Sequence, residues 1–194
     1  MHRAVFLDRD GTVNEEVGYL RDLADLRLIA GAGAAIRRLN EAGLKVVMVT
    51  NQSGVARGYF PELLVLEAHE RLERMLQEEG ARIDAIYYCP HHPTAGNSSY
   101  TVACDCRKPG TGLIDRAARD LGIDVKKSYV VGDKWSDVEL GQRAGAHSIL
   151  VRSGFAPDDP GNIRPARVSD PDFIAGTLLD AAEWIIQRVS KDTV

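Results

Sequence analysis

The stretch Val5-Phe6-Leu7-Asp8-Arg9-Asp10-Gly11-Thr12 decides the fold. An apolar run ends in two carboxylates two residues apart, followed by a glycine and a hydroxyl residue. Because side chains alternate along a strand with a period of two, we expect Asp8 and Asp10 on one side of the strand's carboxyl end, with Arg9 pointing away. Two close carboxylates repel each other, so a divalent cation or a shared proton is expected between them. The alternative is a solvated acidic turn after a buried strand.

Apolar runs alternate with helical patterns along the whole chain. Strands are predicted at Ala4–Asp8, Lys45–Thr50, Ala85–Cys89, Ser128–Gly132 and His147–Arg152. Helices are predicted at Ala34–Ala42, Pro61–Glu79, Gly112–Leu121, Ser136–Ala144 and Leu178–Val189. The range Gly154–Pro171 is interpreted as a surface loop, and Trp184 as a core residue. This order predicts an α/β fold with a doubly wound parallel sheet, which binds ligands outside the carboxyl ends of its strands.

Three later motifs also follow predicted strands. Thr50-Asn51-Gln52-Ser53-Gly54 and Gly132-Asp133 each end an apolar run, and Arg107-Lys108-Pro109 lies between them. Taken singly, Thr50 would be a turn hydroxyl, Asp133 a helix N-cap and Lys108 a surface lysine. Together with the first octet and in this order, they resemble the nucleophile, phosphate-binding, lysine and acidic motifs of the haloacid dehalogenase (HAD) superfamily of phosphohydrolases.

The resemblance implies a mechanism and a set of residues. Asp8 would be the nucleophile, forming an aspartyl-phosphate, and Asp10 the general acid and base. Thr50 and Lys108 would hold the transferring phosphoryl group. Mg²⁺ would be bound by the Asp8 side chain, the Asp10 backbone carbonyl and the Asp133 side chain. Lys134 and Asp137 are expected to position this metal site.

No stretch is long enough for a separate cap domain. The segment from Gly11 to Ala32 allows a helical turn and a hairpin flap, and the segment from Pro90 to Asp105 is also short. We therefore expect a capless enzyme with one HAD-like domain over residues 1–194, in which loops supply the specificity.

All three cysteines lie close to a pair of histidines, His91 and His92. The pattern predicts a closed, structural zinc site with one histidine and three thiolates. Three buried thiols beside a loop histidine are the alternative. His91 fits the spacing better than His92, although the two could exchange. The predicted zinc ligands are Cys89, His91, Cys104 and Cys106, and they would anchor the loop that presents Arg107 and Lys108. The other histidines, His2, His69 and His147, have no obvious partners and are expected at the surface or in packing.

This decorated pattern resembles one family within the superfamily, the D,D-heptose 1,7-bisphosphate phosphatases. The resemblance rests on Cys-Pro-His-His-Pro, Cys-Asp-Cys-Arg-Lys-Pro and Thr-Asn-Gln-Ser-Gly-Val-Ala-Arg-Gly, and runs from about Ala4 to Arg152. It implies removal of the 7-phosphate of a heptose bisphosphate on the route to ADP- or GDP-activated heptose, with the anomer left open. The substrate-binding residues would be Glu16, Val17, Gly18, Tyr19, Asn51, Gln52, Ser53, Arg107 and Lys134.

Composition narrows the alternatives. The 194 residues are 44% hydrophobic and 27% charged, as in an ordinary globular protein, and the net charge of −4 disfavours a nucleic-acid partner, including a nucleic-acid 3′-phosphate. With no membrane span or signal peptide expected, a cytoplasmic monomer acting on a small molecule is predicted. The nearest rival is a histidinol-phosphate phosphatase. A phospho-receiver module would not need Asp10, and a zinc-stabilised interaction module would leave the four motifs unexplained.

Overall fold

Six parallel strands form a single sheet in the order β3-β2-β1-β4-β5-β6. The computed structural model describes residues 1–96, 99–154 and 162–191. The strands are β1 (Ala4–Leu7), β2 (Lys45–Asn51), β3 (Ala85–Cys89), β4 (Tyr129–Gly132), β5 (His147–Val151) and β6 (Phe173–Ala175). The predicted α/β fold is confirmed.

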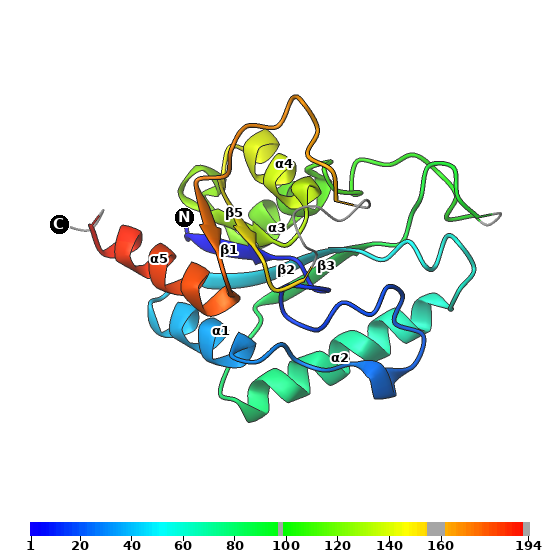
Figure 1. Cartoon of the computed structure of the whole chain (residues 1–194), viewed down its shortest axis with the longest axis horizontal. Coiled ribbons are helices and arrows are strands. Elements are labelled where there is room, and N and C mark those ends of the chain that lie inside the picture. The colour runs from blue at the N-terminus through cyan, green and yellow to red at the C-terminus, as the bar shows by residue number, and fades with distance from the viewer. Residues whose placement is uncertain (97–98, 155–161, 192–194) are drawn as a thin grey trace.

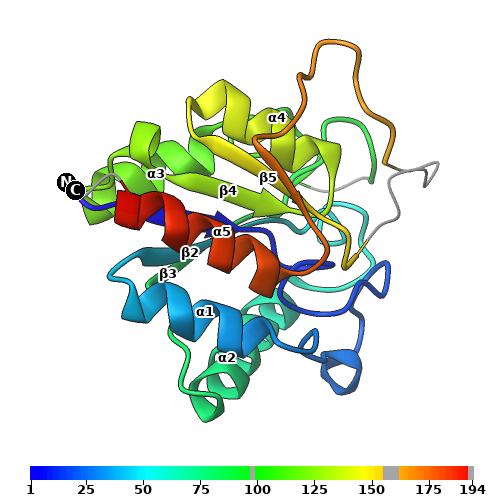
Figure 2. The same ribbon diagram turned by 60° about the vertical axis from the view of Figure 1, so that its left-hand side comes forward.

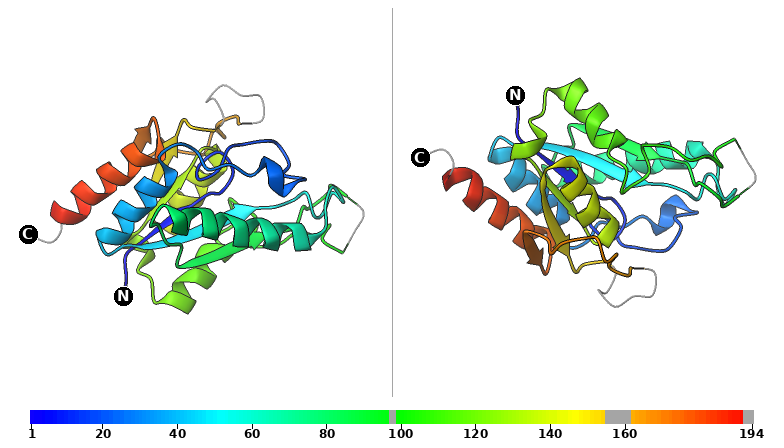
Figure 3. Two further views of the ribbon diagram at one scale, coloured as in Figure 1. Left: turned by 90° about the horizontal axis from the view of Figure 1, so that it is seen from below. Right: turned by 90° about the horizontal axis from the view of Figure 1, so that it is seen from above.

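Helices cover both faces of the sheet, as Figures 1 and 2 show. On one face pack α1 (Ala32–Glu41), α2 (Glu62–Glu78) and α5 (Leu178–Lys191), and on the other α3 (Gly112–Leu121) and α4 (Trp135–Ala144). Two 3₁₀ turns, η1 (Leu23–Asp25) and η2 (Val125–Lys127), lie in the connections. In the two panels of Figure 3, seen from below and from above, opposite helical layers lie nearest the viewer. None of the helices in the described part of the chain combines the length and apolar character that crossing a membrane requires.

The central strand β1 is buried on both faces. Val5 and Leu7 pack in the core under α1, α2 and α5, whereas Ala4 and Phe6 pack in the core under α3 and α4. This is the reason for an uninterrupted apolar run in a parallel strand. Because β1 lies between β2 and β4, the residues that follow it come to the middle of the sheet's carboxyl edge.

In the described residues, only short segments follow β1 and β3 at the sheet's carboxyl edge. Between β1 and α1 the chain forms η1 and isolated bridges that join Asn14 to Asp10 and to Leu28, as expected for a helical turn and a flap. After β3, the described residues 90–96 and 99–111 contain no helix or strand.

The last strand, β6, was not predicted. It pairs in parallel with β5 and follows the predicted loop Gly154–Pro171, of which residues 155–161 lie outside the described residues. Phe173 of β6 stacks on Trp184 of α5 with ring centroids 5.1 Å apart. Trp184 is half-buried against the core, so it has the packing role that was predicted.

Candidate active site and candidate metal centres

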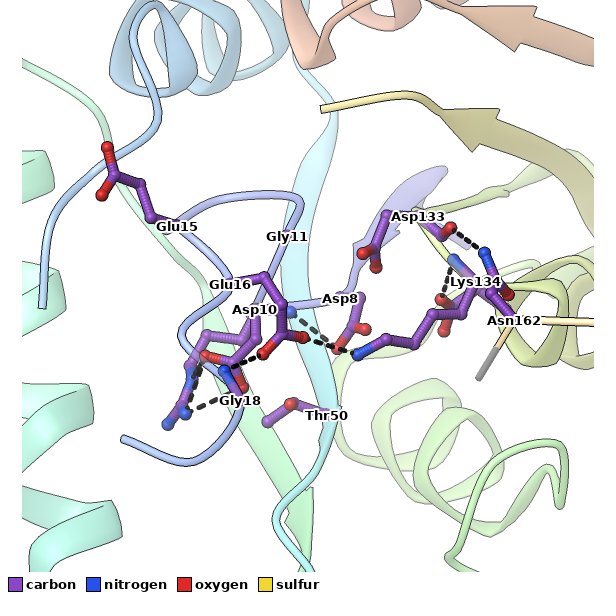
Figure 4. A network of polar contacts seen from close by, with 12 residues as sticks. Asp8, Asp10, Gly11, Glu15, Glu16, Gly18, Thr50, Asp133, Lys134 and Asn162 are labelled. Atoms are coloured by element: carbon purple, nitrogen blue, oxygen red, sulfur yellow. Dashed lines mark hydrogen bonds and ion pairs between the residues drawn. The ribbon is translucent and has the colours of Figure 1, made fainter. Parts of the chain in front are cut away.

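Three buried carboxylates and a buried lysine meet at the carboxyl ends of β1 and β4. Asp8, Asp133 and Asp137 offer oxygen atoms that all lie within 4.8 Å of one another. Lys108 Nζ lies 2.8 Å from Asp8 Oδ1 and 2.7 Å from Asp137 Oδ1. Figure 4 shows Asp8, Asp133 and Lys134 gathered beside the turn at Gly11, whereas Glu15 lies apart. The motifs that contain Asp8 and Asp133 therefore lie next to the lysine motif in the folded chain.

Opposite charges offset the cost of burying these lysines and carboxylates. Burial would lower the pKa of Lys108, but the carboxylates of Asp137 and Asp8 outweigh it and raise that pKa. Burial acts in the same direction on Lys134, whose pKa is nevertheless raised by Asp8, Asp133 and Glu16. The two ammonium groups thus lie among Asp8, Asp133, Asp137 and Glu16, whose negative charge favours the charged form of both lysines.

Two glycines make room for the Asp133 carboxylate. A Cβ atom added at Gly11 or at Gly154 would lie 2.1 Å from Asp133 Oδ2, and Gly11 adopts a φ of +81° that favours glycine. Asn162 donates a hydrogen bond to the Asp133 backbone oxygen at 3.0 Å and accepts one from the Trp135 amide at 2.8 Å. Oxygen donors held in such a cradle are the ligands that Mg²⁺ takes in proteins, so the residues fit that ion.

Asp10 and Arg9 depart from the predicted arrangement. The Arg9 side chain does not point away: it is buried and forms an ion pair with the partly buried Asp10 at 2.9 Å. The physical reason is that β1 ends at Leu7, so strand alternation no longer sets the side-chain directions beyond it. Burial would raise the pKa of Asp10, but Arg9, Asn14 and Gln52 outweigh it and lower that pKa. Arg9 is a site residue that the sequence interpretation missed.

A cavity of about 410 Å³ opens beside this cluster. Arg9, Asp10 and Lys108 line it. So do nearly all of the predicted substrate-binding residues: Glu16, Gly18, Tyr19, Asn51, Gln52, Ser53, Arg107 and Lys134. Val17 is not among the described residues that line it, and 42% of its surface is exposed. The predicted Thr50 is buried and accepts a hydrogen bond from Gln52 Nε2 at 3.0 Å.

Paired contacts hold the cavity walls in place. Lys134 Nζ donates to Glu16 Oε2 at 2.8 Å, and the Gly18 amide donates to Glu16 Oε1 at 2.7 Å. Asn51 Oδ1 accepts a hydrogen bond from the Lys108 amide at 3.0 Å. The flap after β1, the end of β2 and the lysine motif are thus joined around one space.

The four predicted zinc ligands come together in the loop after β3. The sulfur atoms of Cys89, Cys104 and Cys106 lie 3.2–3.6 Å apart, and His91 Nδ1 lies 3.3 Å from Cys106 Sγ. Tetrahedral zinc with Zn–S bonds of ~2.3 Å places its sulfur ligands about 3.8 Å apart. Small outward shifts would therefore accommodate the ion. None of the three cysteines forms a disulfide, so all three sulfur atoms are available as metal ligands.

His92 is occupied elsewhere. Its Nδ1 accepts hydrogen bonds from the amides of Thr94 and Ala95 at 3.2 and 2.8 Å, and its Nε2 lies 3.2 Å from Arg57 Nη2. His91 rather than His92 is therefore the histidine of the cysteine group.

Two other histidines have partners that the sequence did not reveal. His147 Nδ1 lies 2.9 Å from Asp172 Oδ1. The buried His69 lies 3.4 Å from Arg9 Nη1 through its Nε2.

Comparison with known proteins agrees with this geometry. The chain is 41% identical to the D-glycero-beta-D-manno-heptose-1,7-bisphosphate 7-phosphatase of Haemophilus ducreyi, over 94% of this chain and 98% of that protein. It is 44% identical to the D-glycero-D-manno-heptose-1,7-bisphosphate 7-phosphatase of Thermosynechococcus vestitus, over 96% and 97% of the two chains. The chain belongs to the heptose-1,7-bisphosphate 7-phosphatase family.

A solved structure and a family model extend this result. The structure is that of the D,D-heptose 1,7-bisphosphate phosphatase from B. bronchiseptica, complexed with magnesium and phosphate. It matches with a TM-score of 0.82 and 31% identity, covering 96% of this chain and 99% of that one. Residues 105–181 match the HAD-hydrolase-like family model. This family member is accordingly a HAD-type phosphatase, as the four motifs predicted.

Proposed function

We propose that this protein hydrolyses the 7-phosphate of D-glycero-D-manno-heptose 1,7-bisphosphate and releases heptose 1-phosphate. The observation that carries the proposal is the identity of 41–44% to 7-phosphatases over nearly the whole chain. The site supports it, because Asp8 and Lys108 lie beside a cavity of about 410 Å³ that contains cationic and polar groups. The matched relatives do not favour histidinol phosphate, and Asp10 beside Asp8 argues against a phospho-receiver.

In the proposed reaction, a carboxylate oxygen of Asp8 bonds to phosphorus while the bond from phosphorus to the sugar oxygen breaks. Asp10 donates a proton to the departing oxygen. It then takes a proton from a water molecule whose oxygen bonds to phosphorus, which breaks the aspartyl-phosphate bond and releases phosphate. The bound phosphate is negative and so opposes the donors that keep Asp10 ionised, because a nearby negative charge raises a carboxyl pKa. Lys108 and Thr50 would hold the phosphoryl oxygens, and Arg107 would recognise the sugar phosphate.

Two metal ions complete the proposal. Asp8, the Asp10 carbonyl and Asp133 would hold Mg²⁺, with Lys134 and Asp137 placing the ligands around it. When bound, the ion supplies positive charge that offsets the repulsion between the phosphate and Asp8. Support comes from the buried oxygen donors and from the magnesium in the B. bronchiseptica structure. Zinc would be held by the three cysteines and His91, fixing the loop that leads into Arg107 and Lys108.

The proposal is tested by measuring kcat/KM in the presence of Mg²⁺ for both anomers of the bisphosphate and for histidinol phosphate. We expect one heptose anomer to be preferred at least a hundredfold, about 2.7 kcal/mol of transition-state discrimination. The name of the H. ducreyi relative favours the β anomer. A preference for histidinol phosphate would overturn the substrate while leaving the chemistry in place. Arg107→Lys should lower kcat/KM for the heptose bisphosphate. Lysine keeps the charge but loses the planar fork that binds phosphate through two parallel hydrogen bonds.

A further inference from the structure

A fully buried arginine lies directly behind the acid/base carboxylate. Arg9 is 2% exposed, although it immediately follows Asp8 on the first turn. Its Nη2 donates to both oxygens of Asp10 at 2.9 Å, and its Nε donates to Asp10 Oδ1 at 3.1 Å. Such a forked contact fixes the plane of a carboxylate as well as its position. The phosphoryl chemistry described above assigns no role to this residue.

Two amide side chains complete the hold on Asp10. Asn14 Nδ2 donates to Oδ1 at 2.9 Å, and Gln52 Nε2 donates to Oδ2 at 2.9 Å. Gln52 also accepts a hydrogen bond from Arg9 Nη2 at 3.0 Å, so arginine and glutamine support each other. Donors from the first turn, the flap and the end of β2 therefore constrain one carboxylate.

The helix α2 supports the arginine from behind. His69 on α2 is buried with its Nε2 3.4 Å from Arg9 Nη1, and the ring of Tyr88 packs edge-on against it with centroids 5.4 Å apart. Burial and the neighbouring guanidinium lower the pKa of His69 to about 3. The ring is therefore neutral at physiological pH and accepts a hydrogen bond from Arg9 instead of repelling it.

We infer that Arg9 is a positioning residue for Asp10: it holds the carboxylate in the orientation from which a proton passes to the departing sugar oxygen. The inference rests on the proposed phosphatase chemistry and adds a residue that acts through another: Arg9 reaches the cavity wall but is only 2% exposed, and its guanidinium contacts Asp10. Placement of an acid/base group within hydrogen-bond reach of its target is a condition for proton transfer. Flexible placement would reduce the rate without preventing substrate binding.

The leaving group distinguishes positioning from general damage. A sugar oxygen is a strongly basic leaving group and needs the proton from Asp10, whereas 4-nitrophenolate is weakly basic and leaves without it. In single turnovers with enzyme in excess, release of the alcohol or phenol reports only the transfer of the phosphoryl group to Asp8. For Arg9→Met we expect release from the heptose bisphosphate to slow at least a hundredfold, with less than a fivefold change for 4-nitrophenyl phosphate. Half-saturating substrate concentrations should change less than threefold.

A double-mutant cycle with Asp10→Asn gives the second test, and it also removes the charge that Arg9→Met would leave unpaired. If Arg9 acts through Asp10, adding Arg9→Met to Asp10→Asn changes the release rate less than threefold. Arg9→Lys should give an intermediate rate, since an ammonium group cannot reproduce the fork. The exposed Arg37→Met on α1 is the matched control.

Equal slowing of both leaving groups, or a further tenfold loss in the Asp10→Asn background, would overturn the inference. Failure of the substrate assignment is a separate result, because it appears as inactivity of the wild-type enzyme on the heptose bisphosphate. In that case histidinol phosphate replaces the heptose bisphosphate in the same comparison, since its alcohol oxygen is also a strongly basic leaving group.

Discussion

Lys108 Nζ lies 2.8 Å from Asp8 Oδ1, and both side chains are almost entirely buried. The same ammonium group lies 2.7 Å from Asp137 Oδ1. A single ammonium group therefore offsets the charges of two carboxylates, Asp8 and Asp137, in a place that is shielded from water. Removal of the lysine would leave two buried carboxylates without this cation, which is costly. Lys108 thus has a part in stability as well as in the proposed chemistry.

Lys108→Met should destabilise the protein by roughly 3–5 kcal/mol in magnesium-free buffer, because Asp8 and Asp137 then face each other without their cation. Saturating Mg²⁺ should restore more stability to this variant than to the wild type, since the ion brings opposite charge to the same carboxylates. Urea unfolding with and without Mg²⁺ measures both effects. The exposed Lys127→Met is the control, and equal stability of the two variants would contradict the account.

Asp8→Asn should abolish turnover while the fold is retained. An amide cannot form the aspartyl-phosphate, so we expect kcat to fall at least ~1,000-fold, about 4 kcal/mol of transition-state stabilisation. Phosphate release and thermal unfolding are measured on the same preparation, with the exposed Asp25→Asn as the matched carboxylate control. Phosphate release at the wild-type rate by Asp8→Asn would remove Asp8 as the nucleophile.

The cysteine group should hold about one zinc ion per chain. His91→Ala removes a ligand and should lose most of the metal, whereas His92→Ala should keep it, because His92 is bonded to the Thr94 and Ala95 amides. Elemental analysis of freshly purified variants gives the zinc content. Full zinc content in His91→Ala would show that this histidine is not a ligand.

His69 should make the protein less stable in acid. Its pKa is about 3 in the folded state, against 6.5 normally, so below pH 6.5 the unfolded chain binds a proton that the folded chain does not. Stability therefore falls as the pH falls, by up to ~1.4 kcal/mol per pH unit from this group alone. Between pH 7 and 5, the wild type should lose about 2 kcal/mol more than His69→Gln in urea unfolding. The exposed His2→Gln should follow the wild type; identical curves for all three proteins would contradict the prediction.

Much of the fold was predictable because local patterns and tertiary burial agree. The helix Gly112–Leu121 has the predicted bounds, since its apolar face and its terminal Gly122 both mark it. The strand β6 was missed because three residues are too few to show a period, and its partners lie on β5 and α5. Short edge strands of this kind are defined by the sheet they join rather than by their own sequence.

The site was predictable where motifs follow strands, and less so where contacts cross the chain. The convergence of Asp8 and Asp133 follows from parallel topology, since strand ends meet at one edge, whereas Lys108 is brought there by the loop between β3 and α3. The direction of Arg9 was wrong because strand alternation was extended past Leu7, where β1 ends. Its contact with His69 joins positions 60 residues apart and leaves no local signal in the sequence.

Gly11 and Gly154 approach the Asp133 carboxylate from opposite ends of the sequence, which has a consequence for biosynthesis. Asp8 is synthesised before Gly154, so the space around Asp133 is enclosed only after β5 has been made. A nascent chain that already carries Asp8 would therefore have no working site. Phosphatase activity would therefore begin in a single step, once β5 has been made and both glycine segments have docked on the sheet.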